Sequence, residues 1–517
     1  MKLCTINNTF RYELENICRL FFPFEKITVC ETDCETDDPG EMKVIAALRE
    51  LEDRNCEPTD SRESSGESCG DGATDKRARL TVTFTADGFG RTAESEAAHC
   101  DMQGFSDECE RVLAVLLFNI LCEYTGTKPR WGILTGVRPG KLMRRLTEDI
   151  GADEAKKYFA EKLLCSEEKI DLCRTAAENE EKIIATSKPN HFSLYFAIPF
   201  CPTRCSYCSF VSHSVEQSMN LVGEYVELLC NELAVTGKIA REKGLELSTV
   251  YIGGGTPTTL SAEQLDKVLT AVSENFDIEK ATEFTVEAGR PDTITADKLN
   301  AIKRGGATRI SINPQTLNDS VLEVIGRRHT TRQTLDAFRL ARECGFDNIN
   351  MDLIAGLPTD TLESFTRTVD GVLALDPESI TIHTLSMKRS SRLTVGGILP
   401  DVQQGELAAQ MLRVASDKLR EKYAPYYLYR QSKTVGNLEN TGWAKPGYEG
   451  LYNIFMMDET HTVLACGASG VTKLKTGENT IERIFNYKYP YEYISRYDEI
   501  IRRKDGINGF YARYPLA

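Results

Sequence analysis

Between residues 193 and 387, six short apolar segments alternate with longer segments whose apolar residues recur at helical spacing. Strands that alternate with helices are typical of parallel β-α-β units with right-handed connections. Six such units predict an α/β fold, a partial (βα)6 TIM-like barrel whose chemistry gathers at the C-terminal ends of the strands. The predicted strands are 193–200, 247–255, 283–289, 308–315, 348–356 and 378–387.

The unusual residues of this region follow the predicted strand ends. Cys201 comes directly after the first strand, and the run GGGTP at 253–257 closes the second. Glu287 and Gln315 end the third and fourth strands, and Asp352 lies within the fifth. Because the carboxyl ends of parallel strands meet at one rim, we expect these residues to share one site. A carboxylate between apolar neighbours, as at Asp352, also needs a partner if it is buried.

The N-terminal part predicts a separate accessory module. Residues 1–130 read as an α/β unit with strands at 26–30 and 77–88 and a helix at 108–126 that Gly126 ends. A stretch near 57–76 is rich in Ser, Gly, Asp and Glu, which predicts a mobile loop.

Three further parts complete the predicted domain organisation. Residues 131–189 form a helical bridge, 190–390 the barrel core, and 391–517 a C-terminal α+β region that caps the barrel mouth over the substrate.

Within this chain, segment 128–146 combines a Trp, proline-bounded turns and several Arg and Lys residues. The favoured interpretation is a turn that leads into an amphipathic helix. The alternative is a docking surface for the rest of the chain or for an anion.

Composition narrows the possible partners. The formal net charge is −15, which argues against a broad basic surface for nucleic acid. The N-terminal sequence lacks the pattern of a secretory signal, and no apolar run reaches the ~18 residues of a membrane span. The seventeen cysteines are odd in number and irregularly spaced, which favours a reducing cytoplasm over a disulfide framework. We therefore expect a cytoplasmic protein, and a monomer.

One cysteine pattern predicts specific chemistry. Cys201, Cys205 and Cys208 form a C-x3-C-x2-C loop, and three thiolates on a short loop can hold three irons of a [4Fe–4S] cubane. The fourth iron is then free for the amino and carboxylate groups of a methionine-like ligand. Reduction of a sulfonium at this position would release a 5′-deoxyadenosyl radical that can abstract hydrogen from an unactivated carbon. The alternative is a structural zinc ion, with His213 as the fourth ligand.

Several segments together resemble a known family. They are YFAIPFCPTRCSYCSF, YIGGGTPTTL, VEAGRPD, RISINPQTLND, IGRRHT and NMDLIAGLP. They are similar to the oxygen-independent coproporphyrinogen III oxidase (coproporphyrinogen dehydrogenase) family of radical S-adenosylmethionine (SAM) enzymes, in its long HemZ-type branch. The resemblance is specific from about residue 190 to 390. It implies the radical SAM barrel and two cofactors, a [4Fe–4S] cluster on the three cysteines and SAM.

The resemblance also implies roles for single residues. Tyr195 would contact SAM, Tyr207 would pack on the adenine, and Glu287 would bind the ribose. The glycines of the second strand would let the backbone approach the methionine moiety, where a Cβ would be in the way. Arg327 lies beside Arg328 and could instead be a solvated residue. The full set of implied SAM contacts is Tyr195, Tyr207, Gly253, Gly254, Gly255, Thr256, Glu287, Gln315, Arg327 and Asp352.

By the same resemblance, the reaction would be the oxidative decarboxylation of coproporphyrinogen III to protoporphyrinogen IX. An electron donor such as flavodoxin or ferredoxin would reduce the cluster. The substrate is a tetracarboxylate, so cations should line its pocket. The candidates are Lys388, Arg389, Arg392, Arg430 and Lys433. Two departures from the bacterial oxidase pattern, Ala197 in place of a His and Phe210 in place of a further Cys, leave the SAM chemistry intact.

Two alternatives remain open at this level. The first is a haem chaperone built on the same scaffold. Related haem chaperones carry a His-Asn-x-x-Tyr-Trp segment, whereas the comparable stretch here, 448–453, has no His. The second is a different radical SAM reaction on a tetrapyrrole.

Overall fold

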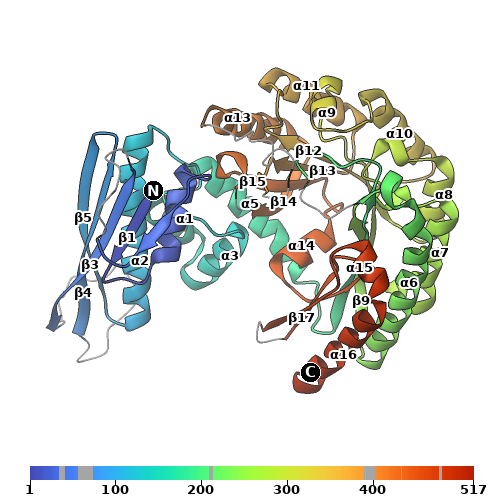
Figure 1. Ribbon diagram of the computed structural model, residues 1–517, viewed down its shortest axis with the longest axis horizontal. Coiled ribbons are helices and arrows are strands. Elements are labelled where there is room, and N and C mark those ends of the chain that lie inside the picture. The colour runs from blue at the N-terminus through green and yellow to red at the C-terminus, as the bar shows by residue number, and fades with distance from the viewer. Residues whose placement is uncertain are drawn as a thin grey trace. The chain divides into compact units, whose positions relative to one another are not determined.

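The chain folds into two compact units (Figure 1). The computed structural model describes residues 1–33, 41–55, 74–208, 213–388, 391, 402–431, 433–476 and 480–516. Unit 1 comprises Met1–Gly136 and Leu146–Asp171, and unit 2 comprises Val137–Arg145 and Leu172–Ala517. The four-part division expected from the sequence stays a prediction. Most of its expected mobile loop, residues 57–73, lies outside the described residues.

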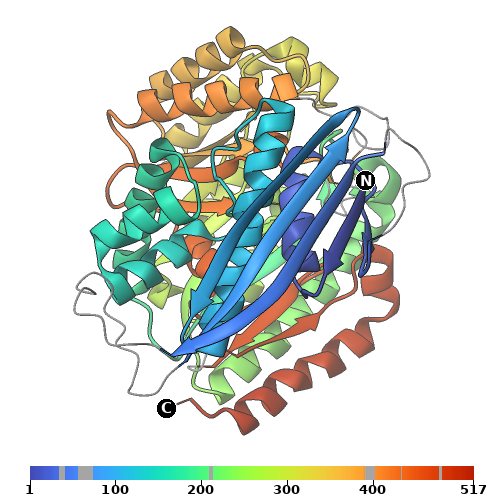
Figure 2. The same cartoon turned by 90° about the vertical axis from the view of Figure 1, so that its left-hand side faces the viewer.

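Unit 1 is built on a five-stranded sheet with strand order β2-β1-β3-β4-β5. Two helices, α1 and α2, cover one face of this sheet, and Figure 2 shows the strands in front of them. The strands are β1 (Lys2–Ile6), β2 (Thr28–Cys30), β3 (Lys43–Asn55), β4 (Thr74–Ala86) and β5 (Phe89–His99). The helices are α1 (Arg11–Phe21), α2 (Met102–Thr125), α3 (Pro139–Ile150, whose first part belongs to unit 2), α4 (Ala152–Lys157), the π-helical turn η1 (Tyr158–Lys162) and α5 (Glu167–Ile184, which crosses into unit 2).

Period-two alternation explains how β4 packs. Every second residue from Ala78 to Ala86 is buried, and these side chains form the core face of the sheet. Helix α2 supplies the opposing apolar surface. Asp101 caps its first turn by accepting the Gly104 N–H at 2.8 Å, and Gly126 ends it with a left-handed φ of 67°.

Six parallel strands form the centre of unit 2, in the order β13-β12-β11-β10-β9-β6. They are β6 (His191–Ile198), β9 (Glu246–Gly254), β10 (Glu283–Glu287), β11 (Arg309–Ser311), β12 (Ile349–Ala355) and β13 (Ser379–Thr384). The helices around them are α6 (Val215–Glu242), α7 (Ala262–Asn275), α8 (Ala296–Arg304), α9 (Asp319–Val324), α10 (Thr331–Glu343) and α11 (Leu362–Leu375), with 3-10 turns η2 (Pro257–Thr259), η3 (Ile278–Lys280) and η4 (Pro291–Thr293). The predicted barrel is confirmed.

Capping boxes help to set two of these helices in place. Ser261 and Gln264 exchange side-chain and backbone hydrogen bonds at the start of α7, and Thr330 and Gln333 do the same at α10. The box at α7 follows the loop after β9 and the box at α10 follows α9, so each fixes where its helix begins.

The C-terminal part extends this sheet on both sides. Strand β15 pairs antiparallel with β13, whereas β16 pairs parallel with β6, which gives an eleven-stranded sheet. The elements are α13 (Val402–Leu419), β14 (Ala424–Arg430), η5 (Val435–Asn437), β15 (Glu439–Ala444), α14 (Leu451–Asp458), β16 (Thr462–Cys466), β17 (Val471–Lys475), β18 (Ile481–Phe485), α15 (Pro490–Ser495) and α16 (Tyr497–Arg513). A short two-stranded sheet joins β7 (Phe200–Cys201) to β8 (His213–Ser214). No helix in the described part of the chain is both long and apolar enough to cross a membrane.

The basic segment after Gly136 is bound to the rest of unit 2. Arg138 forms an ion pair with Glu459 at 2.6 Å, and Arg144 contacts both Glu180 and Asp458. The turn and amphipathic helix expected here are present. Their cations also dock this segment onto the loop between α14 and β16, as the alternative interpretation had it.

Candidate active site

A cavity of about 610 Å³ lies at the carboxyl ends of the parallel strands of unit 2. Its lining includes the three cysteines of the predicted cluster loop and every predicted SAM contact except Gly253. The structure therefore brings together residues that are up to 157 positions apart, from Tyr195 to Asp352. The lining also includes Tyr251, Arg290, Asn313, Asn350, His383, Lys388, Tyr452, Met456, Met457, Ser469 and Lys473.

The cysteine loop is held by backbone and side-chain hydrogen bonds. Ser206 N–H donates to the Ile325 carbonyl at 2.9 Å. Thr256 Oγ1 donates to Cys201 Sγ at 3.5 Å, and an Arg290 Nη donates to Cys205 Sγ at 3.8 Å. Donors aimed at sulfur favour thiolates, which is the form that binds iron.

The spacing of the sulfur atoms does not fit a single zinc ion. Four ligands at about 2.3 Å from zinc would place sulfur atoms about 3.8 Å apart. Among the described residues, the group of three metal-binding side chains with ligand atoms within 4.8 Å of one another is His99, Cys100 and Asp101. The three cysteines are not in that group, so at least one pair of their sulfur atoms lies more than 4.8 Å apart, farther than two sulfur ligands of one zinc ion.

Close backbone approach explains the glycine run. A Cβ on Gly255 would lie 2.6 Å from the Phe200 carbonyl oxygen, and Gly254 has a φ of 102°. A Cβ on Gly253 would lie about 3 Å from the side chains of Tyr251 and Glu287. Gly253 thus supports the site from behind, while Gly254 and Gly255 face the cavity.

Two buried side chains present unsatisfied polar atoms. Gln315 adopts a left-handed φ of 68° and its Oε1 has no hydrogen-bond partner. Arg327 donates to the Asn313 carbonyl at 2.6 Å and to Tyr207 Oη at 3.1 Å, while its Nε has no partner. Buried groups of this kind need a ligand, so the residues present fit a polar cofactor such as SAM.

Tyr195 lies in an aromatic stack, whereas Tyr207 is a buried partner of Arg327. Tyr195 stacks on Tyr251 and Tyr452 with ring centroids 6.3 Å apart in both cases, and Tyr251 lies 4.5 Å from Tyr452. Burial raises the pKa of Tyr207 well above its usual range, so it stays a neutral hydrogen-bond partner of Arg327. The stack gives one wall of the cavity a planar apolar surface.

Two carboxylates of the site differ in protonation. Burial raises the pKa of Asp352, but the His383 side chain at 3.6 Å and the Asn350 amide at 2.7 Å together hold it below its usual value. Burial, together with the charge of Asp352, raises the pKa of Glu287 to about 7. The hydrogen bond that Tyr251 Oη donates to Glu287 opposes this rise. Asp352 is therefore a fixed anion, and Glu287 can gain or lose a proton near neutral pH.

This difference predicts a pH-dependent stability of the ligand-free protein. The folded chain keeps a proton on Glu287 that the unfolded chain releases near pH 4.5, so stability falls as pH rises from about 4.5 to about 7. Glu287→Gln should match the wild type at pH 4.5 and exceed it at pH 8, by up to about 3 kcal/mol in urea unfolding. The exposed Glu279→Gln is the control, with no such gap. An equal difference in unfolding free energy between Glu287→Gln and the wild type at pH 4.5 and at pH 8 would contradict the raised pKa of Glu287.

Three residues of the site carried no sequence signal of their own. Arg290 lies in the quoted VEAGRPD segment without an assigned role, and His383 and Tyr251 lie inside predicted strands. Alternation along those strands could have placed Tyr251 and His383 on the inner face of the barrel. Nothing in the sequence shows that Arg290 reaches a cysteine.

The predicted substrate cations separate into three groups. Lys388 lines the cavity, whereas Arg430 and Lys433 do not. Arg389 and Arg392 lie outside the described residues. Lys473 of β17, which the sequence interpretation missed, also lines the cavity, and an ion pair of 3.7 Å joins it to Glu459.

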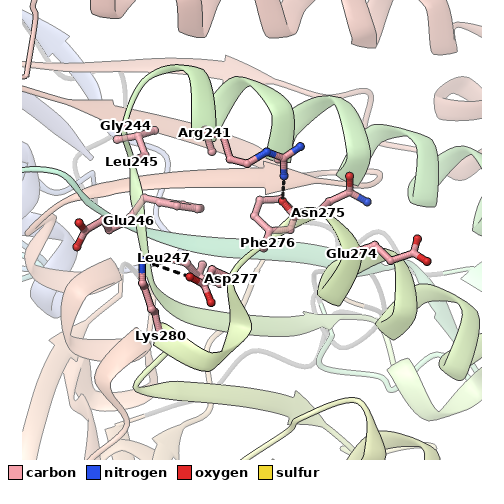
Figure 3. Close-up of a pocket in the computed structure, with 13 residues that line it drawn as sticks. Arg241, Gly244, Leu245, Glu246, Leu247, Glu274, Asn275, Phe276, Asp277 and Lys280 are labelled. Carbon is pink, nitrogen blue, oxygen red and sulfur yellow. Dashed lines mark hydrogen bonds and ion pairs between the residues drawn. The ribbon is translucent and has the colours of Figure 1, made fainter.

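A second cavity, of about 500 Å³, opens at the amino-terminal end of β9 (Figure 3). Three of its charged side chains have local partners: Arg241 donates to the Asn275 carbonyl, and Lys280 pairs with Asp277 at 3.3 Å. It gathers no reactive groups, so the chemistry of unit 2 belongs to the first cavity.

A partial barrel with a three-cysteine loop at its carboxyl rim defines a radical SAM protein, and the Radical SAM superfamily matches residues 195–371. Its cofactors are a [4Fe–4S] cluster and SAM. HemZ of Bacillus subtilis strain 168, described as an oxygen-independent coproporphyrinogen-III oxidase-like protein, is 33% identical over 95% of this chain and 94% of its own length. The chain belongs to this HemZ family of coproporphyrinogen III oxidase-like proteins.

Other relatives carry two different functional names. The haem chaperone HemW of Bacillus subtilis strain 168 is 33% identical over 54% of this chain and 70% of its own length. The solved structure of coproporphyrinogen III oxidase (HemN) from Escherichia coli, a radical SAM enzyme, is 24% identical over 62% of this chain and 71% of its own, with a TM-score of 0.48.

Proposed function

We propose that the protein oxidatively decarboxylates coproporphyrinogen III to protoporphyrinogen IX in porphyrin biosynthesis, with Cys201, Cys205 and Cys208 as the cluster ligands. The observation that carries the proposal is the composition of one cavity: the cysteine loop, all predicted SAM contacts except Gly253, and the half-buried Lys388 and Lys473 line it. The bound cluster and SAM supply hydrogen abstraction from carbon. An oxidase name among the relatives supports the same reaction.

The chain's own residues would orient both ligands. Asp352, fixed as an anion by His383 and Asn350, would bind a hydroxyl or ammonium group of SAM. The unsatisfied Gln315 Oε1 would accept a hydrogen bond from the same ligand. The tyrosine stack would exclude water beside the reacting carbon, and the lysines would hold propionate groups.

The balance of the reaction is simple. A hydrogen atom passes from the β-carbon of a propionate to the 5′-deoxyadenosyl radical. CO2 and one electron then leave, and a vinyl group remains. Two propionates react in this way, with an external acceptor for each electron. Anaerobic incubation of reconstituted protein with coproporphyrinogen III, SAM, a reductant and an electron acceptor should give the divinyl product. SAM cleavage without any vinyl product would reject the proposal.

The two lysines of the cavity give a sharper prediction. Burial lowers the pKa of Lys388 and, despite its ion pair with Glu459, of Lys473, so a substrate carboxylate would stabilise each ammonium. Lys473→Ala and Lys388→Ala should each raise the KM for coproporphyrinogen III about tenfold, with little change in substrate-free SAM cleavage. Lys475→Ala is the matched control, because Lys475 lies on the same strand but donates to the Thr460 carbonyl outside the cavity. Equal effects of Lys473→Ala and Lys475→Ala would contradict the assignment.

A haem chaperone is the second candidate, and one observation favours it. Met456 and Met457 line the same cavity, and thioethers can ligate haem iron. Stable stoichiometric haem binding that the Met456→Leu/Met457→Leu variant loses, with no vinyl product formed, would select the chaperone over the oxidase.

A further inference from the structure

Arg290 places a buried positive charge against the cysteine loop. Its side chain is only 3% exposed, and it lies in the loop after β10, at the wall of the same cavity, although no role in holding SAM is predicted for it. One Nη donates to Cys205 Sγ at 3.8 Å and to Thr203 Oγ1 at 3.1 Å. Thr203 belongs to the same loop, so this one guanidinium contacts the loop at two points.

Asp292 fixes the orientation of this guanidinium. Arg290 Nε and its other Nη donate to the two Asp292 carboxylate oxygens at 3.1 Å each. This two-pronged contact leaves the remaining N–H groups pointing at the cysteine loop. The pair is neutral as a whole, but its positive end faces Cys205 and its negative end faces away.

The surroundings of Cys205 are positive as well. Arg327 is also buried, and its charge acts on both Cys205 and Tyr207. Burial and then the charges of Arg327 and Arg290 lower the pKa of His329 to about 3, so His329 adds no charge of its own. Asp292 is thus the acid that balances Arg290 beside this loop.

We propose that Arg290 and Asp292 together set the reduction potential of the cluster through Cys205. Reduction adds an electron to the cluster, and a hydrogen-bond donor with positive charge at a ligand sulfur favours the reduced form. Asp292 opposes this effect, because its charge weakens the field of Arg290. Both are positioning residues for the electron-transfer step, and the inference requires only that Cys205 is a cluster ligand.

The two residues should therefore act with opposite signs. In a potentiometric titration of the reconstituted, SAM-free protein followed by electron paramagnetic resonance, Arg290→Gln should lower the potential and Asp292→Asn should raise it. At a fixed potential near the midpoint, we expect the ratio of reduced to oxidised cluster to change about tenfold in each direction, which is about 59 mV for one electron. Arg328→Gln is the control and should leave the ratio unchanged.

The directions of the two shifts in reduction potential distinguish an effect on the cluster potential from general structural damage. Shifts in the same direction for both variants, or no shift in either, would overturn the proposal. If Arg290→Gln fails to hold iron, Asp292→Asn decides alone: an upward shift supports the proposal, and a downward shift or none rejects it. Failure of the coproporphyrinogen assay would not affect this measurement, because no substrate is present.

Discussion

A Cys205→Ala variant should lose its iron and its ability to cleave SAM while keeping its fold. Three thiolates on one loop hold three irons, so removing one leaves an iron without a protein ligand and exposes the cubane to loss. The loop lies at the cavity rim, where Ser206 N–H and the Ile325 carbonyl hold its backbone independently of the sulfur. Folding should therefore survive, with an unchanged far-ultraviolet circular dichroism spectrum.

Iron content and 5′-deoxyadenosine formation after anaerobic reconstitution measure this effect. Cys230→Ala is the matched control, because Cys230 is a half-buried thiol on α6 that lies outside the cavity. It should keep iron and SAM cleavage at wild-type levels. A Cys205→Ala protein with full iron content and normal cleavage would show that this loop does not hold the cluster.

The largest effect on stability is expected at a buried ion pair between α6 and α16. Lys504 Nζ lies 2.8 Å from Glu232 Oε1, and the two side chains are 1% and 0% exposed. Glu232 also accepts hydrogen bonds from the Gly467 N–H, the Asn486 amide and the Tyr493 hydroxyl at 2.7–2.8 Å. Lys504→Met would leave a buried, uncompensated carboxylate, which costs about 3–5 kcal/mol.

The free energy of urea unfolding of unit 2 checks this value, and a double variant checks its cause. Glu232→Gln/Lys504→Met removes both charges, so it should be less destabilised than the sum of the two single variants. Lys418→Met breaks an exposed pair with Asp370 and should cost less than about 1 kcal/mol. A loss of similar size in Lys504→Met and Lys418→Met would contradict the argument.

This pair also bears on the active site. Glu232 holds the turn after β16, and Ser469 and Lys473, which follow that turn, line the cavity. Lys504→Met should therefore raise the KM for the substrate in the fraction that stays folded.

The barrel could be predicted because its signals are local. Each parallel strand is a short apolar run, each helix shows its own periodicity, and the rule that chemistry lies at strand ends then places Glu287, Gln315 and Asp352 together. All three line the observed cavity. The resemblance added Tyr195 and Arg327, which periodicity alone could not have distinguished from ordinary buried or surface residues.

Features that depend on distant pairing could not be predicted. The strand over 462–466 looks like any short apolar run, and nothing local shows that it pairs parallel with β6, some 270 residues earlier. That pairing is what brings Lys473 to the cavity. The contact of Arg290 with Cys205 likewise joins two loops 85 positions apart.

The fate of one hydrogen atom tests the proposed reaction most directly. Coproporphyrinogen III deuterated at the β-carbons of its propionates should be incubated anaerobically with the reconstituted protein, SAM, a reductant and an electron acceptor, and the 5′-deoxyadenosine analysed by mass spectrometry. The account predicts deuterium in 5′-deoxyadenosine together with a vinyl product. Unlabelled 5′-deoxyadenosine alongside recovered, unreacted coproporphyrinogen III would contradict it.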